Sequence, residues 1–277
     1  MPISETVATF RALHRGASVL LLPNAWDAAT TASFAAAGAK AIATTSAGLA
    51  WACGFPDGDA LPRADLLHAL GSIVAVSGSL PVSADVESGF TDDPLAVADL
   101  VLELCALGIA GINLEDGTQS PELLAAKIAA IKRAVAERGF DIFVNARTDV
   151  YLREFAGGDE AVRETIARAQ RYASAGADGI FAPALADPDA IARIANAVAL
   201  PLSLMAVPEL PPAADLYAYG VRRLSAGSAL AELAYGQARS AADAFLHGGG
   251  VGPLFAGTPA DYRETNEMLI EARAKRG

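Results

Sequence analysis

The sequence predicts an α/β fold, a parallel (β/α)₈ barrel of the TIM-barrel class, followed by a C-terminal helical extension. A helix–glycine–strand pattern recurs along the chain, eight short apolar runs alternate with helical stretches, and acidic residues follow several of those runs. Strict alternation implies parallel strands with right-handed crossovers, and eight such units favour closure into a barrel. An open doubly wound sheet is the alternative, but no Gly-x-Gly-x-x-Gly motif follows the first apolar run.

The recurring unit is an alanine-rich helical stretch that ends in glycine and precedes a short apolar run. It occurs at residues 35–46, 105–116, 173–183 and 217–227, with Gly38, Gly108, Gly176 and Gly220 at the junctions. Helices commonly end in a residue with left-handed backbone, which glycine adopts without strain. The other four strands are expected at residues 19–22, 82–85, 142–146 and 202–206.

Two segments depart from this regular pattern. Residues 46–63 are expected to form a long loop after the second strand. Residues 228–277 extend past the eighth strand, with helical patterns near 229–246 and 259–275 separated by the sequence HGGGVGP. Because no charge run or Gly/Ser linker marks a boundary, we expect residues 1–277 to form one domain.

The composition excludes several classes of partner. Hydrophobic residues make up 53% of the chain and charged residues 19%, which is typical of a folded protein with a large core. The net charge of -11 argues against nucleic acid or an anionic membrane as a partner. Two cysteines, Cys53 and Cys105, are too few for a disulfide scaffold. No signal peptide or membrane-spanning run is visible, so a cytoplasmic protein is expected.

Acidic side chains gather at the expected carboxyl ends of neighbouring strands. Asp85 and Glu87 follow one strand, and Glu115 ends the next. If the strand geometry continues, Asp85 and Glu87 point the same way, and with Glu115 they crowd negative charge that a hard cation such as Mg²⁺ would relieve. A single acid at such a place more often caps a helix. Three acids on adjacent strands favour a metal site.

An acidic protein needs a locally positive site to bind an anion, which a metal ion or a buried arginine can supply. Arg147 follows a strand, and its planar guanidinium suits a carboxylate, although an ion pair with Glu115 or Asp149 is the simpler interpretation. The segment from Thr45 to Leu49 consists of small residues whose backbone N–H groups can form an anion-binding nest, a feature that many tight loops share.

Several motifs together resemble the isocitrate lyase and phosphoenolpyruvate mutase superfamily. They are LLPNAWDA (21–28), TTSAGLA (44–50), GFPDGD (54–59), VSADVESGF (82–90), GINLEDG (111–117) and NARTD (145–149), in matching order over residues 8–230. The resemblance implies a barrel that binds Mg²⁺, or alternatively Mn²⁺. It also implies cleavage or formation of C–C or P–C bonds beside a 2-oxo carboxylate through a metal-stabilised enolate.

The resemblance also implies roles for particular residues. Asp85 is the expected direct metal ligand, with Glu87 and Glu115 completing the metal site and Asp57 helping to hold the metal's waters. Trp26, Thr45, Ser46, Gly48, Leu49, Asp85 and Arg147 are the expected substrate-binding residues. The expected catalytic residues are Asp57, Glu115 and Arg147. In this family the last barrel helix swaps onto a neighbouring subunit, so a homodimer or homotetramer is expected.

One departure from the family narrows the expected activity. The lyases carry a Lys-Lys-Cys-Gly-His motif on a mobile loop after the fourth strand, and this chain has none. Ser120 and Pro121 suit a helix N-cap and first turn, so residues 116–119 alone remain for the loop. Glu87 also stands where aspartate is common, and FAPAL after the sixth strand lacks the histidine or glutamate of some members. Cleavage of isocitrate or 2-methylisocitrate is therefore not expected.

Three functions follow from these considerations. The first is a Mg²⁺-dependent lyase or decarboxylase of a small 2-oxo di-acid such as oxaloacetate, since release of CO₂ needs no general acid at the leaving group. The second is a phosphonate P–C bond mutase or hydrolase, which would need a group on the missing loop to hold the phosphoryl unit. The third is a non-catalytic binder of 2-oxo acids, which the intact acidic residues disfavour.

Overall fold

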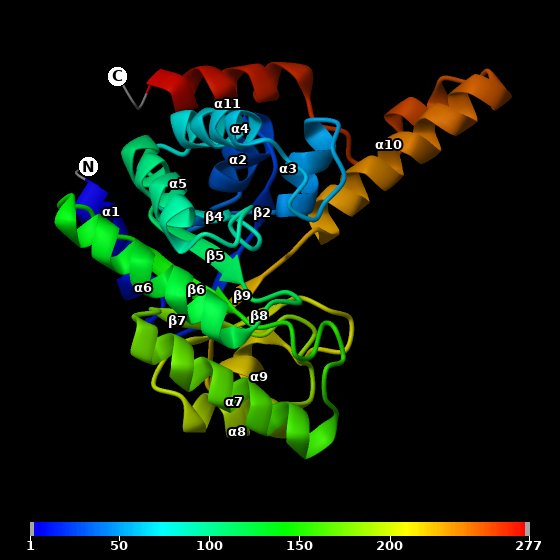
Figure 1. Ribbon diagram of the computed structural model, residues 1–277. Helices are drawn as coiled ribbons and strands as arrows, with labels where there is room; N and C mark the ends of the chain where they lie inside the picture. The colour runs from blue at the N-terminus through cyan, green and yellow to red at the C-terminus, as the bar shows by residue number, and fades with distance from the viewer. Residues whose placement is uncertain (1–2, 275–277) are drawn as a thin grey trace.

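The computed structural model describes residues 3–274 and shows a parallel barrel surrounded by helices (Figure 1). Its strands are β1 (Leu20–Leu22), β2 (Asn24–Ala25), β3 (Ile42–Thr44), β4 (Val82–Asp85), β5 (Gly111–Glu115), β6 (Phe143–Arg147), β7 (Gly179–Phe181), β8 (Leu202–Met205) and β9 (Val221–Ser225). Every pairing between them is parallel, and the order runs from β1 through β9, β8 and so on to β2. The predicted (β/α)₈ barrel is confirmed.

The first strand of the barrel is interrupted, which is why nine strands stand where the sequence predicted eight. Pro23 lies between β1 and β2 and has no N–H to donate to a neighbouring strand. β1 pairs with β9, whereas β2 pairs with β3. Since β1 and β2 are consecutive halves of one extended segment, these two pairings join the ends of the sheet.

The helices before the extension follow the predicted alternation. They are α1 (Ile3–Leu13), α2 (Ala28–Ala36), α3 (Ser46–Ala52), α4 (Arg63–Val76), α5 (Pro94–Leu107), α6 (Pro121–Glu137), α7 (Gly158–Ala175), α8 (Pro188–Ala197) and α9 (Ala213–Ala218). Helix α3 is an added helix after β3, and α2 and α4 to α9 surround the barrel. The predicted left-handed glycines are confirmed, because Gly38, Gly108, Gly176 and Gly220 all have φ between 91° and 105°. The expectation of a loop over residues 46–63 was wrong in its first part. There the Thr45 side chain caps α3, and the loop spans residues 53–62.

Helix α1 closes the N-terminal end of the barrel. Phe10 packs with Leu20, Leu22 and Phe143 in a small apolar cluster, separate from the main core between strands and helices. A Cβ atom at Gly111 would lie 2.7 Å from the Phe10 ring, so glycine leaves the room that Phe10 occupies. His14 stacks on Phe143 with ring centroids 4.3 Å apart and extends this packing at the N-terminal end of the barrel.

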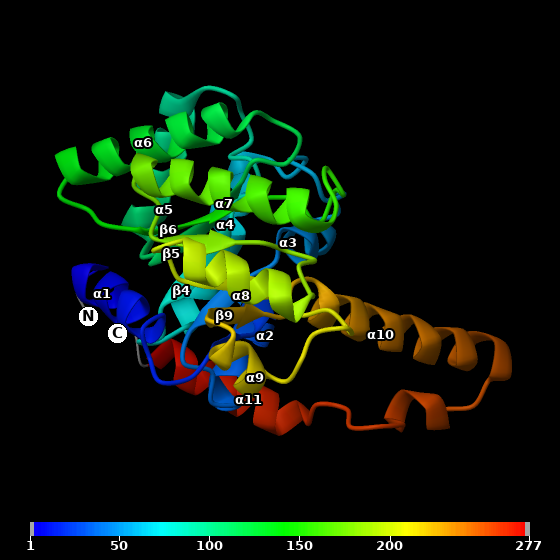
Figure 2. The same cartoon turned by 90° about the horizontal axis from the view of Figure 1, so that it is seen from below.

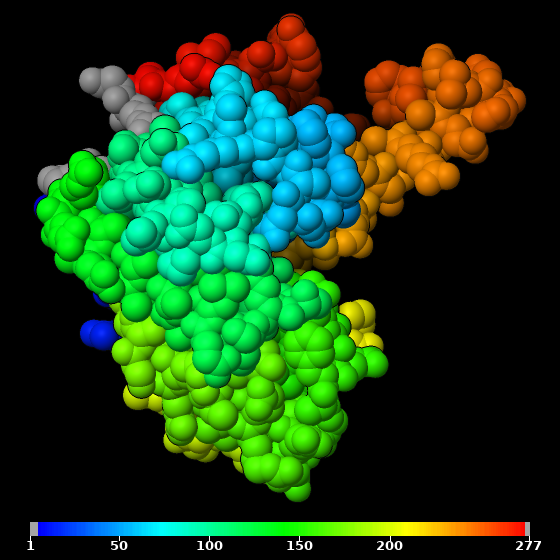
Figure 3. Space-filling view, viewed as in Figure 1, coloured from blue at the N-terminus to red at the C-terminus, as the bar shows by residue number. Residues whose placement is uncertain are grey.

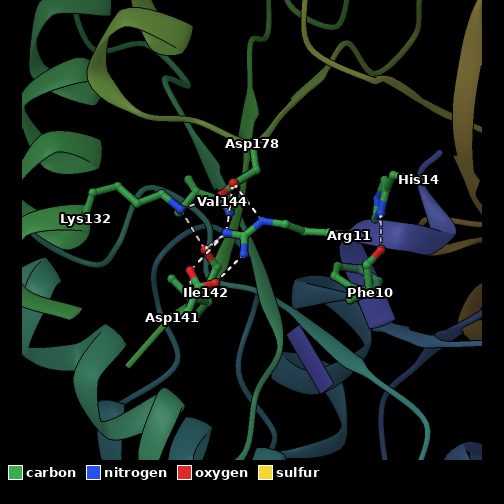
Figure 4. Close-up of polar contacts among 8 residues, drawn as sticks. All are labelled: Phe10, Arg11, His14, Lys132, Asp141, Ile142, Val144 and Asp178. Atoms are coloured by element: carbon green, nitrogen blue, oxygen red, sulfur yellow. Dashed lines mark hydrogen bonds and ion pairs between the residues drawn. The ribbon is translucent and has the colours of Figure 1, made fainter. Parts of the chain in front are cut away.

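A group of ion pairs fastens α1 to the starts of β6 and β7 (Figure 4). Arg11 pairs with both Asp141 and Asp178, and its Nη2–Oδ1 distance to Asp178 is 3.0 Å. Lys132 of α6 reaches Asp178 from the opposite side and donates to the Ile142 carbonyl at 2.7 Å. Asp178 also accepts the Val144 N–H at 2.8 Å. One carboxylate therefore joins helix α1, helix α6 and strand β6.

The C-terminal extension forms an arm that leaves the barrel. Helix α10 (Ala229–Gly248) projects away from the body, the short helix η1 (Gly252–Phe255) lies at its tip, and α11 (Tyr262–Ala274) returns to pack on α2 and α4 (Figures 1 and 2). The space-filling view shows the tip of the arm standing clear of the rest of the molecule (Figure 3). The two predicted helices are confirmed; residues 275–277 lie outside the described residues. Within residues 3–274, no helix is long and apolar enough to cross a membrane.

The burial of His14 predicts a pH dependence of stability. Burial, and then the charge of Arg223, lower the pKa of His14 to about 3. The unfolded chain takes up this proton near pH ~6.5, whereas the folded chain does not until much lower pH. The contribution of His14 to the free energy of unfolding is therefore complete above pH ~6.5. It falls as the pH drops below that value, by up to about 1.4 kcal/mol per pH unit.

Denaturant unfolding at several pH values tests this expectation against His14→Phe, which keeps a ring but cannot titrate. The variant should show a flatter loss of stability between about pH 6 and pH 4, and groups that titrate in both proteins cancel in the difference. Equal slopes for the two proteins would contradict the assignment.

Candidate functional site

The candidate site lies at the carboxyl ends of β4, β5 and β6, where Asp85, Glu115 and Arg147 are the last strand residues. In the register of the sheet, Glu115 stands opposite Arg147 and Asp85 opposite Asn113. The Arg147 Nη1 atom is 2.6 Å from Glu115 Oε2, and both side chains are largely buried. The structure therefore brings together three of the predicted residues, and the expected ion pair of Arg147 is formed.

A second carboxylate fixes the plane of the Arg147 guanidinium. Asp149 accepts from Nε at 2.6 Å and from Nη2 at 3.1 Å, and its side chain is fully buried. Burial opposes the charge of Arg147, but Glu115 and Asp149 outweigh it and raise the Arg147 pKa. A guanidinium has five N–H groups, and these three contacts leave two of them for a ligand.

Asp116 holds Asp149 in place through a backbone hydrogen bond. The Asp149 N–H donates to Asp116 Oδ1 at 2.9 Å. The other oxygen, Oδ2, accepts from Tyr172 Oη at 2.6 Å and from Arg168 Nη1 at 2.9 Å. Tyr172 and Arg168 belong to α7, more than fifty residues away in sequence. Sequence analysis missed both, because no local pattern marks a helical residue that reaches a strand end.

Asp85 is buried within a row of polar side chains that crosses the barrel. Its N–H donates to Thr44 Oγ1 at 2.9 Å, and its carboxylate interacts with the Asn113 side chain. Asn113 accepts from Asn145 at 2.9 Å, and Asn145 accepts from Ser203 at 3.2 Å. Strands β3, β4, β5, β6 and β8 supply these residues. The row fixes the Asp85 side chain from within the barrel.

The expectation that Glu87 continues the strand geometry of Asp85 was wrong. β4 ends at Asp85, and Glu87 has φ of 51°, so the chain turns there. Its carboxylate accepts the Asp59 N–H, and Asp59 in turn accepts from Ser88 Oγ at 2.7 Å. Lys127, buried in α6, donates to the Ser88 carbonyl at 2.8 Å. These contacts bring the loop that carries Asp57 close to the strand ends.

The buried acids repel one another. Burial, and then the charges of neighbouring acids, raise the pKa of Glu87 to about 7. Burial also raises the pKa of Glu115 to about 8, even though Arg147 opposes the shift. The pKa of Asp85 is raised for the same reason, with Asp57 adding to the effect of burial. A hard cation beside these oxygen atoms would favour their charged forms.

The donor set suits Mg²⁺ or Mn²⁺ with few direct protein ligands. Within residues 3–274, no three or more His, Cys, Asp or Glu side chains lie close enough to bind a metal ion together. Mg²⁺ commonly takes one or two carboxylates and keeps several waters. The residues present fit such a cation: Asp85 would hold it, and Glu87, Glu115 and Asp57 would add negative charge nearby.

The residues of the expected anion nest form the first turn of α3. Leu49 donates its N–H to the Thr45 carbonyl at 3.0 Å, so that group is not free, contrary to expectation. The Gly48 N–H has a long contact of 3.5 Å to Thr45 Oγ1. Ser46 is the first residue of the helix and is partly exposed. Ser46 and Gly48 thus remain the candidates for binding a carboxylate.

Trp26 forms one wall beside this helix. A Cβ atom at Gly48 would lie 2.8 Å from the Trp26 Cβ, so the two backbones are in close contact. The Trp26 ring is 6.2 Å from Tyr235 on α10, and Tyr235 is 6.2 Å from Trp51 on α3. The base of the arm therefore packs against the predicted substrate wall.

The segment between β5 and α6 is short, as the sequence predicted, and its side chains hold it in place. It spans residues 116–120, with Ser120 capping α6 through the Leu123 N–H at 3.2 Å. The Gln119 side chain donates to Asp92 at 2.5 Å and accepts from Lys127 at 2.8 Å. Because both the nitrogen and the oxygen of the Gln119 amide are hydrogen-bonded, this segment is poorly suited to move over the site.

Comparisons with known proteins identify the family. The phosphoenolpyruvate phosphomutase family model matches residues 10–246. An uncharacterized protein of Mycobacterium tuberculosis is 40% identical over 230 residues, covering 79% of this chain and 82% of the relative. The probable 2-methylisocitrate lyase 2 of Corynebacterium glutamicum is 30% identical over 213 residues, covering 72% and 66%. The oxaloacetate decarboxylase of Pseudomonas savastanoi pv. phaseolicola is 35% identical over 155 residues, covering 52% and 51%.

The solved structures agree with this family. The crystal structure of a candidate phosphonomutase from Burkholderia cenocepacia matches with a TM-score of 0.80 and 39% identity, covering 90% of this chain and all of the other. The chain therefore belongs to the phosphoenolpyruvate phosphomutase family, within the isocitrate lyase and phosphoenolpyruvate mutase superfamily. The resemblance drawn from the motifs is confirmed, and the protein is a lyase or mutase of this superfamily.

The close contact at Gly48 predicts an unusual response to alanine. Alanine usually stabilises a helix by about 0.5–1 kcal/mol relative to glycine. At Gly48 the added methyl group would instead overlap Thr45 and Trp26, so Gly48→Ala should lower the free energy of unfolding by about 1–3 kcal/mol. Gly71→Ala in α4 is the matched control, because its nearest neighbour would lie at an ordinary 3.8 Å. Denaturant unfolding that shows equal effects at both glycines would contradict the close packing.

Proposed function

We propose that this protein is a Mg²⁺-dependent lyase or decarboxylase of a small 2-oxo di-acid, of which oxaloacetate is the model substrate. The observation that carries the proposal is the buried acid cluster around Asp85 beside an arginine, Arg147, that keeps two N–H groups free. The first feature suits a hard cation and the second a carboxylate. The partial match to an oxaloacetate decarboxylase supports the same chemistry.

Different residues of this chain bind the two ends of the substrate. Ser46 and Gly48 bind the carboxylate beside the oxo group, and Arg147 binds the distal carboxylate. When bound, the cation supplies positive charge for the oxo oxygen, where negative charge develops. In decarboxylation the bond to the distal carboxylate breaks, CO₂ leaves, and the electron pair forms the enolate of the remaining 2-oxo acid. A proton from solvent completes the reaction, consistent with a short β5–α6 segment whose one acid, Asp116, is buried and bonded to Arg168 and Tyr172.

The phosphonate reaction is the second candidate within the family. The similarity to the Burkholderia cenocepacia structure favours it. Phosphoryl transfer needs cationic or amide donors around the phosphoryl group. In the β5–α6 segment, Gln119 has both ends of its side-chain amide engaged, and no basic residue is present between residues 116 and 120. Decarboxylation or C–C cleavage therefore fits these residues better, and a non-catalytic binder is the third possibility that turnover would exclude.

The metal assignment predicts the effect of removing Asp85. Asp85→Ala should weaken Mn²⁺ binding by about 100-fold or more, while the protein stays folded because a buried carboxyl with a raised pKa contributes little stability. Chelation should likewise abolish turnover. Calorimetric titration with Mn²⁺ measures the affinity, and Asp99→Ala, an exposed acid on α5, is the control. Unchanged Mn²⁺ affinity in Asp85→Ala would exclude this residue as the ligand.

The short β5–α6 segment predicts the substrate range. With Mg²⁺, the purified protein should turn over small 2-oxo di-acids and show little or no cleavage of isocitrate or 2-methylisocitrate. The only acid or base of this segment, Asp116, is buried and bonded to Arg168 and Tyr172, so it cannot serve these substrates. A panel of these substrates with a phosphonate control, followed by product chromatography, separates the three functions. Robust isocitrate cleavage would overturn the expectation and require an acid elsewhere in the site.

We also propose that the protein assembles as a homodimer or homotetramer through the arm. Helix α10, η1 and the turn between them expose several large apolar side chains, namely Leu233, Tyr235, Phe245, Leu246, Val251, Leu254 and Phe255. A groove of about 790 Å³ lies beside β1, lined by residues of α1, β1 and α2 that include Leu13, Leu21 and Phe34. Leu21 is 55% exposed although it lies in a barrel strand. The arm of a second copy would cover this strand, where a barrel ordinarily places its last helix.

Light scattering after size exclusion tests the assembly. The wild-type chain should be a dimer or tetramer at micromolar concentration, and Leu246→Asp on the arm should shift it toward monomer by placing a charge in the apolar contact. Leu95→Asp, which changes an equally exposed leucine on α5, should leave the assembly unchanged. A monomeric wild-type protein would disprove the proposed assembly.

A further inference from the structure

Arg223 is a buried arginine without a hydrogen-bond partner. It is 1% exposed, and its side chain is among the largest of those fully buried in residues 3–274. None of its atoms Nε, Nη1 and Nη2 has a partner among the described residues. Buried charges are normally paired, because removing an unpaired one from water is unfavourable. Replacing such a group with an apolar residue of similar size is often neutral or stabilising.

The strand register places Arg223 inside the barrel, below the acid cluster. β9 pairs with β1 and β8, so Arg223 stands opposite Leu20 and Ser203. Leu20 belongs to the interior apolar cluster and Ser203 to the polar row that ends at Asp85. Leu224, the next residue, packs on the outer core instead. The side chain of Arg223 therefore points into the barrel.

The electrostatic neighbours of Arg223 agree with this placement. Its charge lowers the pKa of His14, which lies on α1 at the closed end of the barrel. The Asp85 carboxylate, at the other end, favours the charged form of Arg223. The guanidinium thus lies between the closed N-terminal end and the site. Burial lowers the Arg223 pKa to about 10, which leaves the group charged at neutral pH.

The excess of negative charge at the site suggests how the charge of Arg223 affects ligand binding. Asp85, Glu87 and Glu115 are negative when ionised. Arg147, the cation beside them, is already paired with both Glu115 and Asp149. The substrate proposed for this site is itself a dianion. Like charges placed close together in a medium of low polarity repel strongly, so a second fixed cation near the acids would lower the free energy of anion binding.

We propose that Arg223 is a positioning residue that acts on the site through its charge: from beneath Asp85 it strengthens binding of the anionic 2-oxo acid and weakens binding of the divalent cation. It touches neither ligand. This inference rests on the proposed function, but its cation effect can be measured without any substrate. The two effects have opposite signs, whereas a purely structural role would weaken both kinds of binding together.

The experiment compares three folded variants with the wild-type protein. Arg223→Met removes the charge and keeps the length of the side chain, and Arg223→Lys retains a charge. Arg222→Met is the matched control, because it removes the same charge from the neighbouring residue, which stacks on Tyr217 outside the barrel. Mn²⁺ affinity is measured by electron paramagnetic resonance. Affinity for oxalate, used as an unreactive probe of the 2-oxo acid, is measured calorimetrically with saturating Mg²⁺.

Arg223→Met should bind oxalate about tenfold more weakly and Mn²⁺ about tenfold more tightly, as expected for one charge at a separation of several ångströms. Arg222→Met and Arg223→Lys should stay within about threefold of wild type for both ligands. Arg223→Gln, also uncharged, replaces the methionine variant if that protein does not fold. The thermal midpoint should not fall in the neutral variant.

Two results would overturn the inference. One is no change in either affinity in the neutral variant; the other is weaker binding of both oxalate and Mn²⁺, which would indicate a packing role. If the wild-type protein binds Mn²⁺ but no oxalate, the proposed function fails, and the Mn²⁺ measurement alone then decides the role of Arg223.

Discussion

Ionised side chains inside a parallel barrel must be paired or must have a function, and the Arg147–Glu115 contact shows how the pairing is arranged. The register of β5 and β6 places the two residues opposite each other, so the 2.6 Å ion pair follows from strand pairing. Asp149 then fixes the guanidinium, Asp116 fixes Asp149, and α7 supplies the donors to Asp116. The orientation of one arginine thus depends on two strands and a helix.

The two ends of the barrel bury different kinds of side chain. At the N-terminal end, α1 inserts Phe10 against Gly111 and Phe143, and Arg11 fastens the helix to the ring of strand starts. At the opposite end the carboxylates remain close together, and their pKa values are raised. The first end contributes stability through apolar packing. The second retains unfavourable charge interactions, as expected where a protein binds a charged ligand.

Access to the site is set by two segments that contribute in opposite ways. The β5–α6 segment is short and tied down by Gln119 and Lys127, so it leaves the strand ends open. The arm begins beside the site, where Tyr235 contacts both Trp26 and Trp51, and continues away from the barrel. The wall of the site is therefore continuous with the helix that we propose joins two copies of the chain. Assembly and the shape of the site would then be linked through this aromatic group.

The sequence by itself determined the barrel, its glycine-ended helices, the short β5–α6 segment and the family, because these depend on local backbone preferences, on periodicity and on motifs that lie within a few residues. It also identified Asp85, Glu115 and Arg147, since strand ends meet at one edge of a parallel sheet. It could not place Glu87, whose positive φ breaks the alternation on which the expectation depended. It likewise could not find the contacts of Tyr172 and Arg168 with Asp116, or the unpaired interior position of Arg223. Those features join residues far apart in the chain, and the closure of the barrel and the docking of α7 alone bring them together.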